Sequence, residues 1–125
     1  MSNDKHILYI EDNPGDQELL LIRLEESDFQ GEIQIAEGLK AGLAKLKEQT
    51  FSLIFLDIEL PDSTSLEHTV GDIEQATDTP IIILTGLSDE DIISKIYRNH
   101  KPLAVLQKPL PIRQLKSLIR EFTCS

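Results

Sequence analysis

The sequence predicts an α/β protein in which helices cover both faces of a five-stranded parallel sheet. Three observations predict this fold: short apolar runs alternate with helical patterns, the strongest runs have no polar face, and no repeat or linker interrupts the series. Continuous apolar runs are typical of strands that are covered on both sides. Right-handed crossovers between successive strands then give a three-layer α/β/α arrangement.

The strand candidates are apolar runs of three to five residues. Three are strong, at residues 6–10, 53–56 and 80–84, and two are weaker, at 33–36 and 104–106. The strong runs are rich in β-branched and aromatic residues, which favour strands over helices of the same length. A helical pattern follows each run, so the predicted order is (βα)5.

Helix-start signals and apolar stripes mark the five helices. Asn13 before Pro14 predicts the cap and first residue of the first helix. Ser88 and Asp91 have the spacing of a capping box, and Pro111 opens the last helix. The apolar stripes expected to face the sheet are Leu19, Leu20, Ile22 and Leu24; Leu39, Leu43 and Leu46; Leu66, Val70 and Ile73; Ile92, Ile93 and Ile96; and Ile112, Leu115, Ile119 and Phe122.

Length and composition limit the classes of function. The 125 residues are expected to form one domain, residues 1–125, and 40% hydrophobic residues suffice for one core. A net charge of −10 disfavours binding to nucleic acid or to anionic membranes. No apolar run approaches the roughly 20 residues that span a bilayer, and the first residues do not predict a secretory signal. With Cys124 as the one cysteine, we expect a cytoplasmic protein without disulfides.

Polar side chains follow four of the predicted strands. Glu11 and Asp12 come after the first, Asp57 after the third, Thr85 after the fourth and Lys108 after the fifth. Because the carboxyl ends of parallel strands meet at one edge of a sheet, we expect these side chains to lie close together. Taken singly, Asp12 could cap a helix and Lys108 could be a surface lysine, so the joint placement carries the prediction.

These residue types indicate phosphoryl chemistry. Three neighbouring carboxylates repel one another unless a cation lies among them, and oxygen ligands favour Mg²⁺. The Thr85 hydroxyl and the Lys108 ammonium suit phosphoryl oxygens, and Gly86 leaves space beside them. A carboxylate can act as the nucleophile that forms an aspartyl phosphate, and Asp57, at the end of the central strand, is the candidate.

The sequence resembles the receiver domains of two-component response regulators, in particular single-domain chemotaxis regulators, from Ile7 to about Phe122. The resemblance rests on Ile10-Glu11-Asp12-Asn13, on Leu56-Asp57-Ile58-Glu59-Leu60-Pro61-Asp62, on Leu84-Thr85-Gly86 and on Lys108-Pro109. It implies a flavodoxin-like fold with strand order 2-1-3-4-5. It also implies that Asp57 accepts a phosphoryl group from a phosphohistidine on a sensor histidine kinase or a histidine phosphotransfer protein.

The resemblance assigns a role to each candidate residue. Asp12, Asp57 and the backbone carbonyl of Glu59 would bind Mg²⁺ directly, and Glu11 would act through a metal-bound water. Thr85 and Lys108 would contact the phosphoryl oxygens. The chain would not be an enzyme in the usual sense, because it only takes up and loses its own phosphoryl group. It would signal to a downstream protein, which the sequence does not identify, by changing a partner-binding face.

Two departures from the family pattern affect that switch. Val105 stands three places before Lys108, where an aromatic residue is common, so the usual inward swing of an aromatic ring is not available. Pro102 indicates an altered turn before the fifth strand. Both favour an alternative, a phosphorylation-independent interaction module with the same fold. Exposed residues on the partner-binding face are expected to include Ile96, Tyr97, Lys101 and Arg113.

Two further alternatives fit the residues less well. A phosphatase of the haloacid dehalogenase type needs a second aspartate two residues after its nucleophile, and here that place holds Glu59. Such enzymes usually carry a cap domain as well, for which the chain is short. A flavin-binding domain of the same topology would have to cradle a phosphate with residues 11–16, which are acidic and would repel it.

Overall fold

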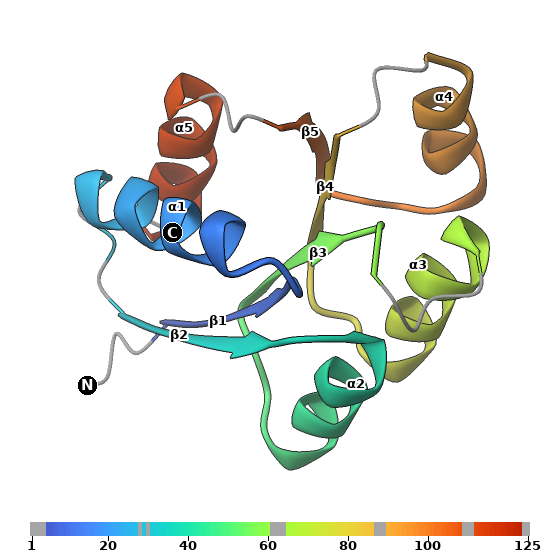
Figure 1. Cartoon of the computed structure of the whole chain (residues 1–125), viewed down its shortest axis with the longest axis horizontal. Coiled ribbons are helices and arrows are strands. Elements are labelled where there is room, and N and C mark those ends of the chain that lie inside the picture. Colours follow the sequence, from blue (N-terminus) through green and yellow to red (C-terminus); the bar gives the residue numbers. More distant parts are fainter. Residues whose placement is uncertain are drawn as a thin grey trace.

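The computed structural model describes residues 5–27, 29, 31–60, 65–86, 90–108 and 112–123. Five strands and five helices alternate along them (Figure 1). The strands are β1 (Lys5–Ile10), β2 (Gly31–Ala36), β3 (Leu53–Asp57), β4 (Ile81–Thr85) and β5 (Ala104–Gln107). The helices are α1 (Pro14–Glu26), α2 (Leu39–Glu48), α3 (Leu66–Ala76), α4 (Glu90–Asn99) and α5 (Ile112–Thr123).

The strands form one parallel sheet in the order β2-β1-β3-β4-β5, which confirms the predicted fold class and strand order. Figure 1 shows α1 and α5 on one face of the sheet and α2, α3 and α4 on the other. The register pairs Ile10 with Leu56 and Asp57 with Leu84. The carboxyl ends of β1, β3 and β4 therefore lie side by side at one edge of the sheet.

Two apolar clusters, one on each face of the sheet, hold the layers together. Side chains alternate between faces along a strand, so Ile7 and Tyr9 pack under α1 and α5, whereas Leu8 and Ile10 pack toward α2, α3 and α4. All five residues of β3 are buried, as expected of a central strand with helices on both sides. The sheet is thus packed on both faces, and its carboxyl edge carries the strand-end residues.

Most helix signals in the sequence are confirmed where the structure describes them. Asn13 caps α1, with its Oδ1 accepting from the Asp16 amide at 3.1 Å. Ile22, however, does not belong to the inner stripe of α1 and is 46% exposed. Leu20 and Leu24 are one helical turn apart and fill the interface, and Ile22 lies between them in sequence on the opposite side. The predicted signals at Ser88 and Pro111, and Cys124, lie outside the described residues.

A polar contact at the opposite edge of the sheet links α3 to the connection before β5. The His100 Nδ1 lies 2.7 Å from Glu74 Oε1, and the Lys101 amide donates to Glu74 Oε2 at 3.0 Å. Burial alone would raise the pKa of Glu74, but the hydrogen bonds from the Lys101 amide and the His100 ring outweigh it. The pKa of Glu74 is therefore lowered.

We expect Glu74→Gln to lower the free energy of unfolding by about 1–2 kcal/mol at pH 7, because it weakens a charge-assisted contact. Since the folded-state pKa lies below the ordinary 4.5, this contribution is present above that pH and is lost as the pH falls through the folded-state value. Urea unfolding of both proteins at pH 7 and pH 3 measures the difference. The exposed Glu48→Gln is the control, and an equal deficit at both pH values would contradict the assignment.

Candidate functional site

Three carboxylates gather where β1 and β3 end. Glu11 and Asp12 follow β1, Asp57 is the last residue of β3, and one oxygen from each lies within 4.8 Å of the others. Glu11 is 0% exposed and Asp57 is 2% exposed, whereas Asp12 faces solvent. The parallel register brings the three together from two strands, as the sequence predicted. Two of these carboxylates are thus buried beside each other, and the third can be reached from outside.

Lys108 and Thr85 complete the predicted group at the ends of β4 and β5. The Lys108 Nζ lies 2.7 Å from Glu11 Oε1 and 3.5 Å from Asp57 Oδ2. The Lys108 amide donates to the Thr85 carbonyl at 2.8 Å, which ties the two strand ends together. Thr85 is buried. The Lys108 ammonium therefore contacts the Glu11 and Asp57 carboxylates, and the backbone of Thr85 is hydrogen-bonded to that of Lys108.

Two residues of this group are not among those that the predicted strand ends indicate. Asp16, in the first turn of α1, accepts from Lys108 Nζ at 2.9 Å, and the Tyr9 hydroxyl donates to Glu11 Oε1 at 2.9 Å. The sequence pattern predicts a strand position for Tyr9, and it assigns no role in this group to Asp16. A signal for Tyr9 does exist, because residues two apart on a strand share a face and Tyr9 stands two before Glu11.

Electrostatics in the group reflect burial and crowding. Burial raises the pKa of Glu11, and the neighbouring Asp57 raises it further, although Lys108 opposes the shift. Burial lowers the pKa of Lys108, but hydrogen bonds to Glu11 and Asp16 outweigh it, so the pKa is raised and the ammonium stays charged. Burial and the Glu11 carboxylate together raise the pKa of Tyr9, so its hydroxyl keeps its proton as a hydrogen-bond donor.

Glu59 bridges the loops that follow β3 and β4. Its amide donates to Asp57 Oδ1 at 3.0 Å, and its Oε1 accepts from the Gly86 amide at 3.3 Å. The side chain is exposed and stands apart from the three-carboxylate group. These contacts involve the amide and side chain, so metal binding through the Glu59 carbonyl stays a prediction. Pro61, Asp62 and Pro109, which belong to the quoted motifs, lie outside the described residues.

The donor set fits a hard divalent cation. All three clustered ligands are carboxylates, with no sulfur or imidazole ligand among them, and such oxygen sites suit Mg²⁺. Burial and the neighbouring Asp57 raise the pKa of Glu11, and a cation between the two carboxylates would remove the repulsive part of that shift. Glu11, Asp12 and Asp57 are the described residues that could hold it.

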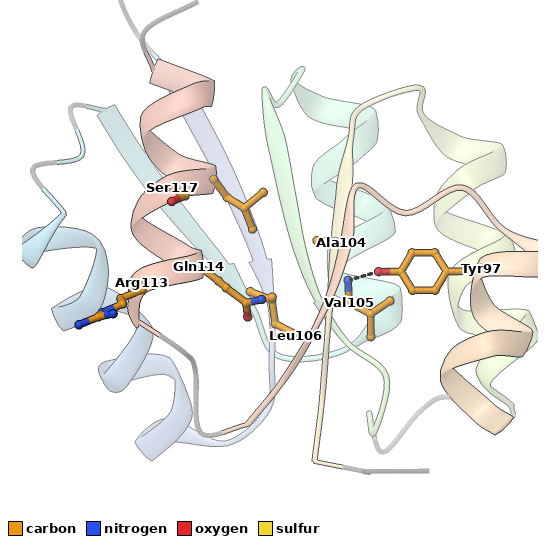
Figure 2. Close-up of a pocket in the computed structure, with 8 residues that line it drawn as sticks. Tyr97, Ala104, Val105, Leu106, Arg113, Gln114 and Ser117 are labelled. Carbon is orange, nitrogen blue, oxygen red and sulfur yellow. Dashed lines mark hydrogen bonds between the residues drawn. The ribbon is translucent and has the colours of Figure 1, made fainter. Parts of the chain in front are cut away.

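A second surface feature lies on the face formed by α4, β5 and α5. A pocket of about 410 Å³ opens there, and Figure 2 shows Tyr97 reaching across from α4 toward β5. The Tyr97 hydroxyl accepts from the Val105 amide at 3.1 Å (Figure 2). Tyr97, Lys101 and Arg113 are exposed as expected, but Ile96 is not: it is 1% exposed and packs in the core, because it lies on the inner stripe of α4.

No helix among the described residues is long and apolar enough to cross a membrane. The longest, α1, has 13 residues and several charges.

Together, the parallel sheet and the acidic strand ends define a receiver-type α/β protein. The sequence profile of the response regulator receiver domain matches residues 7–120, which is most of the chain. The chain therefore belongs to the response regulator receiver domain family of two-component signalling systems. Members of this family generally bind Mg²⁺ at an acidic pocket, and Glu11, Asp12 and Asp57 form an acidic cluster here.

Curated relatives agree with this assignment. The chain is 34% identical over 115 residues to the response regulator ArlR of Staphylococcus saprophyticus, covering 91% of this chain and 50% of the relative. It is 31% identical over 117 residues to the probable C4-dicarboxylate response regulator DctR of Halalkalibacterium halodurans, covering 93% of this chain and 50% of the relative. The chain thus spans about half the length of the curated relatives it matches.

Solved structures share the fold. A CheY-like response regulator receiver domain protein from Methanospirillum hungatei superposes with a TM-score of 0.80 at 24% identity, covering 97% of this chain and 94% of the other. The signal receiver domain of an HD domain-containing protein from Pseudomonas fluorescens gives a TM-score of 0.81 at 22% identity, covering 94% and 93%. At these identities the likeness concerns the fold alone.

Proposed function

We propose that this receiver domain accepts a phosphoryl group on Asp57 in a Mg²⁺-dependent reaction, from a phosphohistidine on a partner protein. The observation that carries the proposal is the joint position of the buried Asp57 carboxylate, two further carboxylates and the Lys108 ammonium at one edge of the sheet. The chain would thereby act as a signalling protein that changes its binding to a downstream partner.

Each residue would have a separate task in the transfer. An Asp57 carboxylate oxygen attacks the phosphorus, the P–N bond to the donor imidazole breaks, and the bonding pair leaves with the imidazole nitrogen, which takes a proton from solvent. Lys108 and the Thr85 hydroxyl would bind the phosphoryl oxygens as charge partner and donor. Glu11 and Asp12, with Asp57, would hold Mg²⁺, which neutralises the charge of the transferred group.

The test is intact mass spectrometry after incubation with acetyl phosphate and Mg²⁺. We expect a mass gain of one phosphoryl group when Mg²⁺ is present, and no gain when the incubation contains EDTA instead. A folded protein that takes up no phosphoryl group under these conditions would contradict the proposal. That result would instead favour a phosphorylation-independent interaction module. Val105, which stands where an aromatic residue is common in the family, is consistent with that alternative.

Glu59 provides a further prediction for the same reaction. Its exposed carboxylate accepts from the Gly86 amide, next to Thr85 in the loop after β4, so an anionic phosphoryl donor that approaches Thr85 would meet a negative charge. We expect Glu59→Gln to accelerate adduct formation from acetyl phosphate by about two- to fivefold, the effect of one exposed charge at short range.

Time-resolved intact mass at low and high salt measures this effect. The acceleration should shrink as salt screens the charge, and Glu48→Gln on α2 should leave the rate unchanged. Equal rates for Glu59→Gln and the native protein would show that the Glu59 charge does not hinder the donor.

A further inference from the structure

Tyr9 carries a hydroxyl group in a place where packing alone does not require one. The side chain is 0% exposed and packs edge-on against Phe55, with ring centroids 6.2 Å apart and an interplanar angle of 75°. A phenylalanine would supply the same apolar contacts, and a buried hydroxyl is costly unless it is hydrogen-bonded. The hydroxyl is therefore best explained by the groups that it contacts.

The hydroxyl lies between the acidic group and α1. It donates to Glu11 Oε1 at 2.9 Å and lies 3.4 Å from the Asp16 carbonyl oxygen, so the shorter contact is the one to Glu11. Tyr9 and Glu11 are two residues apart at the end of β1, and the strand geometry itself directs both side chains to the same face. The contact thus follows from the backbone of a central strand rather than from a mobile loop.

The Glu11 carboxylate receives two donors on one oxygen. Oε1 accepts from the Tyr9 hydroxyl at 2.9 Å and from Lys108 Nζ at 2.7 Å, whereas Oε2 accepts from the Asn13 amide at 3.4 Å. Two short hydrogen bonds from different elements fix the orientation of the carboxylate. If Lys108 turned toward a phosphoryl group, the Tyr9 hydroxyl would still donate a short hydrogen bond to Glu11 Oε1.

We propose that Tyr9 is a positioning residue, whose buried hydroxyl orients Glu11 for the divalent cation of the acidic group. The inference rests on the proposed function and adds a residue to its cation site. Groups that orient a metal-binding carboxylate by hydrogen bonding commonly contribute to metal affinity without contacting the ion. The competing explanation is that Tyr9 is only a core residue, whose hydroxyl stabilises the fold.

The first experiment compares Mg²⁺ dissociation constants by calorimetry for the native chain, Tyr9→Phe and Tyr97→Phe. We expect Tyr9→Phe to bind Mg²⁺ roughly three- to tenfold more weakly, the effect of losing one hydrogen bond to the carboxylate. Tyr97→Phe removes the hydroxyl that contacts the Val105 amide and should leave the affinity unchanged. Native affinity in Tyr9→Phe, whatever its stability, would overturn the inference.

The second experiment asks whether Tyr9 acts through Glu11. In a double-mutant cycle with Glu11→Gln, the effect of Tyr9→Phe on Mg²⁺ affinity should largely disappear, because the carboxylate that Tyr9 orients is gone. An undiminished effect in the Glu11→Gln background would overturn the assignment. If Tyr9→Phe weakened Mg²⁺ binding only by disturbing the core, the loss of affinity would be the same in the native and the Glu11→Gln backgrounds. The cycle therefore separates an effect through Glu11 from an effect through the core.

A third measurement does not depend on the folding of Tyr9→Phe. The chain has two tyrosines and no tryptophan, so Tyr9 is the only such fluorophore in Tyr97→Phe. Mg²⁺ should change its emission with the midpoint found by calorimetry, since its carboxylate partner changes environment. Calorimetric binding without any change in emission would count against the inference alone. Absence of Mg²⁺ binding by the native chain would overturn the inference together with the Mg²⁺-dependent function.

Discussion

Asp57→Asn is expected to abolish the phosphoryl adduct completely and to stabilise the Mg²⁺-free protein. An asparagine has no carboxylate nucleophile, so no acyl phosphate can form at residue 57. The same change removes a negative charge that raises the pKa of Glu11, and the remaining carboxylate then pairs with Lys108 without competition. We expect the gain in the free energy of unfolding without metal to be about 1 kcal/mol, or roughly a fivefold change in the folding equilibrium.

Asp57→Asn should also reduce the stabilisation that Mg²⁺ provides, although it stabilises the Mg²⁺-free protein. For the native protein, Mg²⁺ at 100 times its dissociation constant should add about 2.7 kcal/mol to the free energy of unfolding. Asp57→Asn loses one of the three clustered carboxylates and should gain much less at the same concentration. Urea unfolding with EDTA and with Mg²⁺ gives both values, and intact mass after incubation with acetyl phosphate gives the adduct.

Asp72→Asn is the matched control, because Asp72 is an exposed aspartate on α3. It should keep the adduct and the native response to Mg²⁺. A phosphoryl adduct on Asp57→Asn would show that another residue is the acceptor. An Asp57→Asn protein that lost stability without Mg²⁺ would show that Asp57 contributes more through its contacts with Lys108 and Glu59 than it costs through repulsion.

The strand-end residues could be predicted from the sequence because two regularities act together. A buried parallel strand is a continuous apolar run, so the first polar residue after it marks the strand end. The parallel register then places these ends at one edge, which is why Glu11, Asp57, Thr85 and Lys108 meet. No knowledge of side-chain conformation was needed for this step.

The partners of those residues could not be predicted in the same way. Asp16 reaches Lys108 from the first turn of α1, 92 residues away in sequence, and that contact depends on how α1 leans on the sheet. The Tyr97–Val105 contact likewise joins an outer helix to an edge strand through one hydroxyl. Such contacts depend on side-chain rotamers and helix placement, for which an apolar pattern carries no information.

Ile96 shows a different limit. Its position in the stripe with Ile92 predicted burial, whereas its place in the expected partner-binding face predicted exposure. In the structure Ile96 is buried, because residues four apart on a helix share one face and that face of α4 packs on the core. Helical periodicity was thus the better guide, and Tyr97, one residue further on, points outward.

Lys108→Met is expected to have the largest effect on stability. Methionine keeps the length of the apolar stem but removes the cation that lies 2.7 Å from Glu11, 2.9 Å from Asp16 and 3.5 Å from Asp57. Glu11 would then be a buried carboxylate without its charge partner. Removing one member of a buried ion pair typically costs 3–5 kcal/mol, and because Lys108 is 20% exposed we expect about 2–3 kcal/mol at pH 8 without metal.

The loss should depend on pH in a defined direction. The folded-state pKa of Lys108 is raised above the ordinary 10.5, so the ammonium is charged at both pH 4 and pH 8, and the pH dependence over this range comes from its partner Glu11. The folded-state pKa of Glu11 is also raised, so folding favours its protonated form, and stability falls as the pH rises above 4.5. Without Lys108 the pKa of Glu11 is raised further, so the fall continues to higher pH and its total is larger. The variant should therefore differ little from the native protein at pH 4 and most at pH 8.

Mg²⁺ should restore part of the stability of Lys108→Met, because a divalent cation among the carboxylates replaces the missing charge. Urea unfolding at pH 4 and pH 8, with EDTA and with Mg²⁺, measures each of these effects. Lys116→Met, an exposed position on α5, is the control and should match the native protein throughout. A loss that is the same at both pH values and insensitive to Mg²⁺ would mean that Lys108 stabilises the fold through packing of its stem, and that the acidic group does not need its charge.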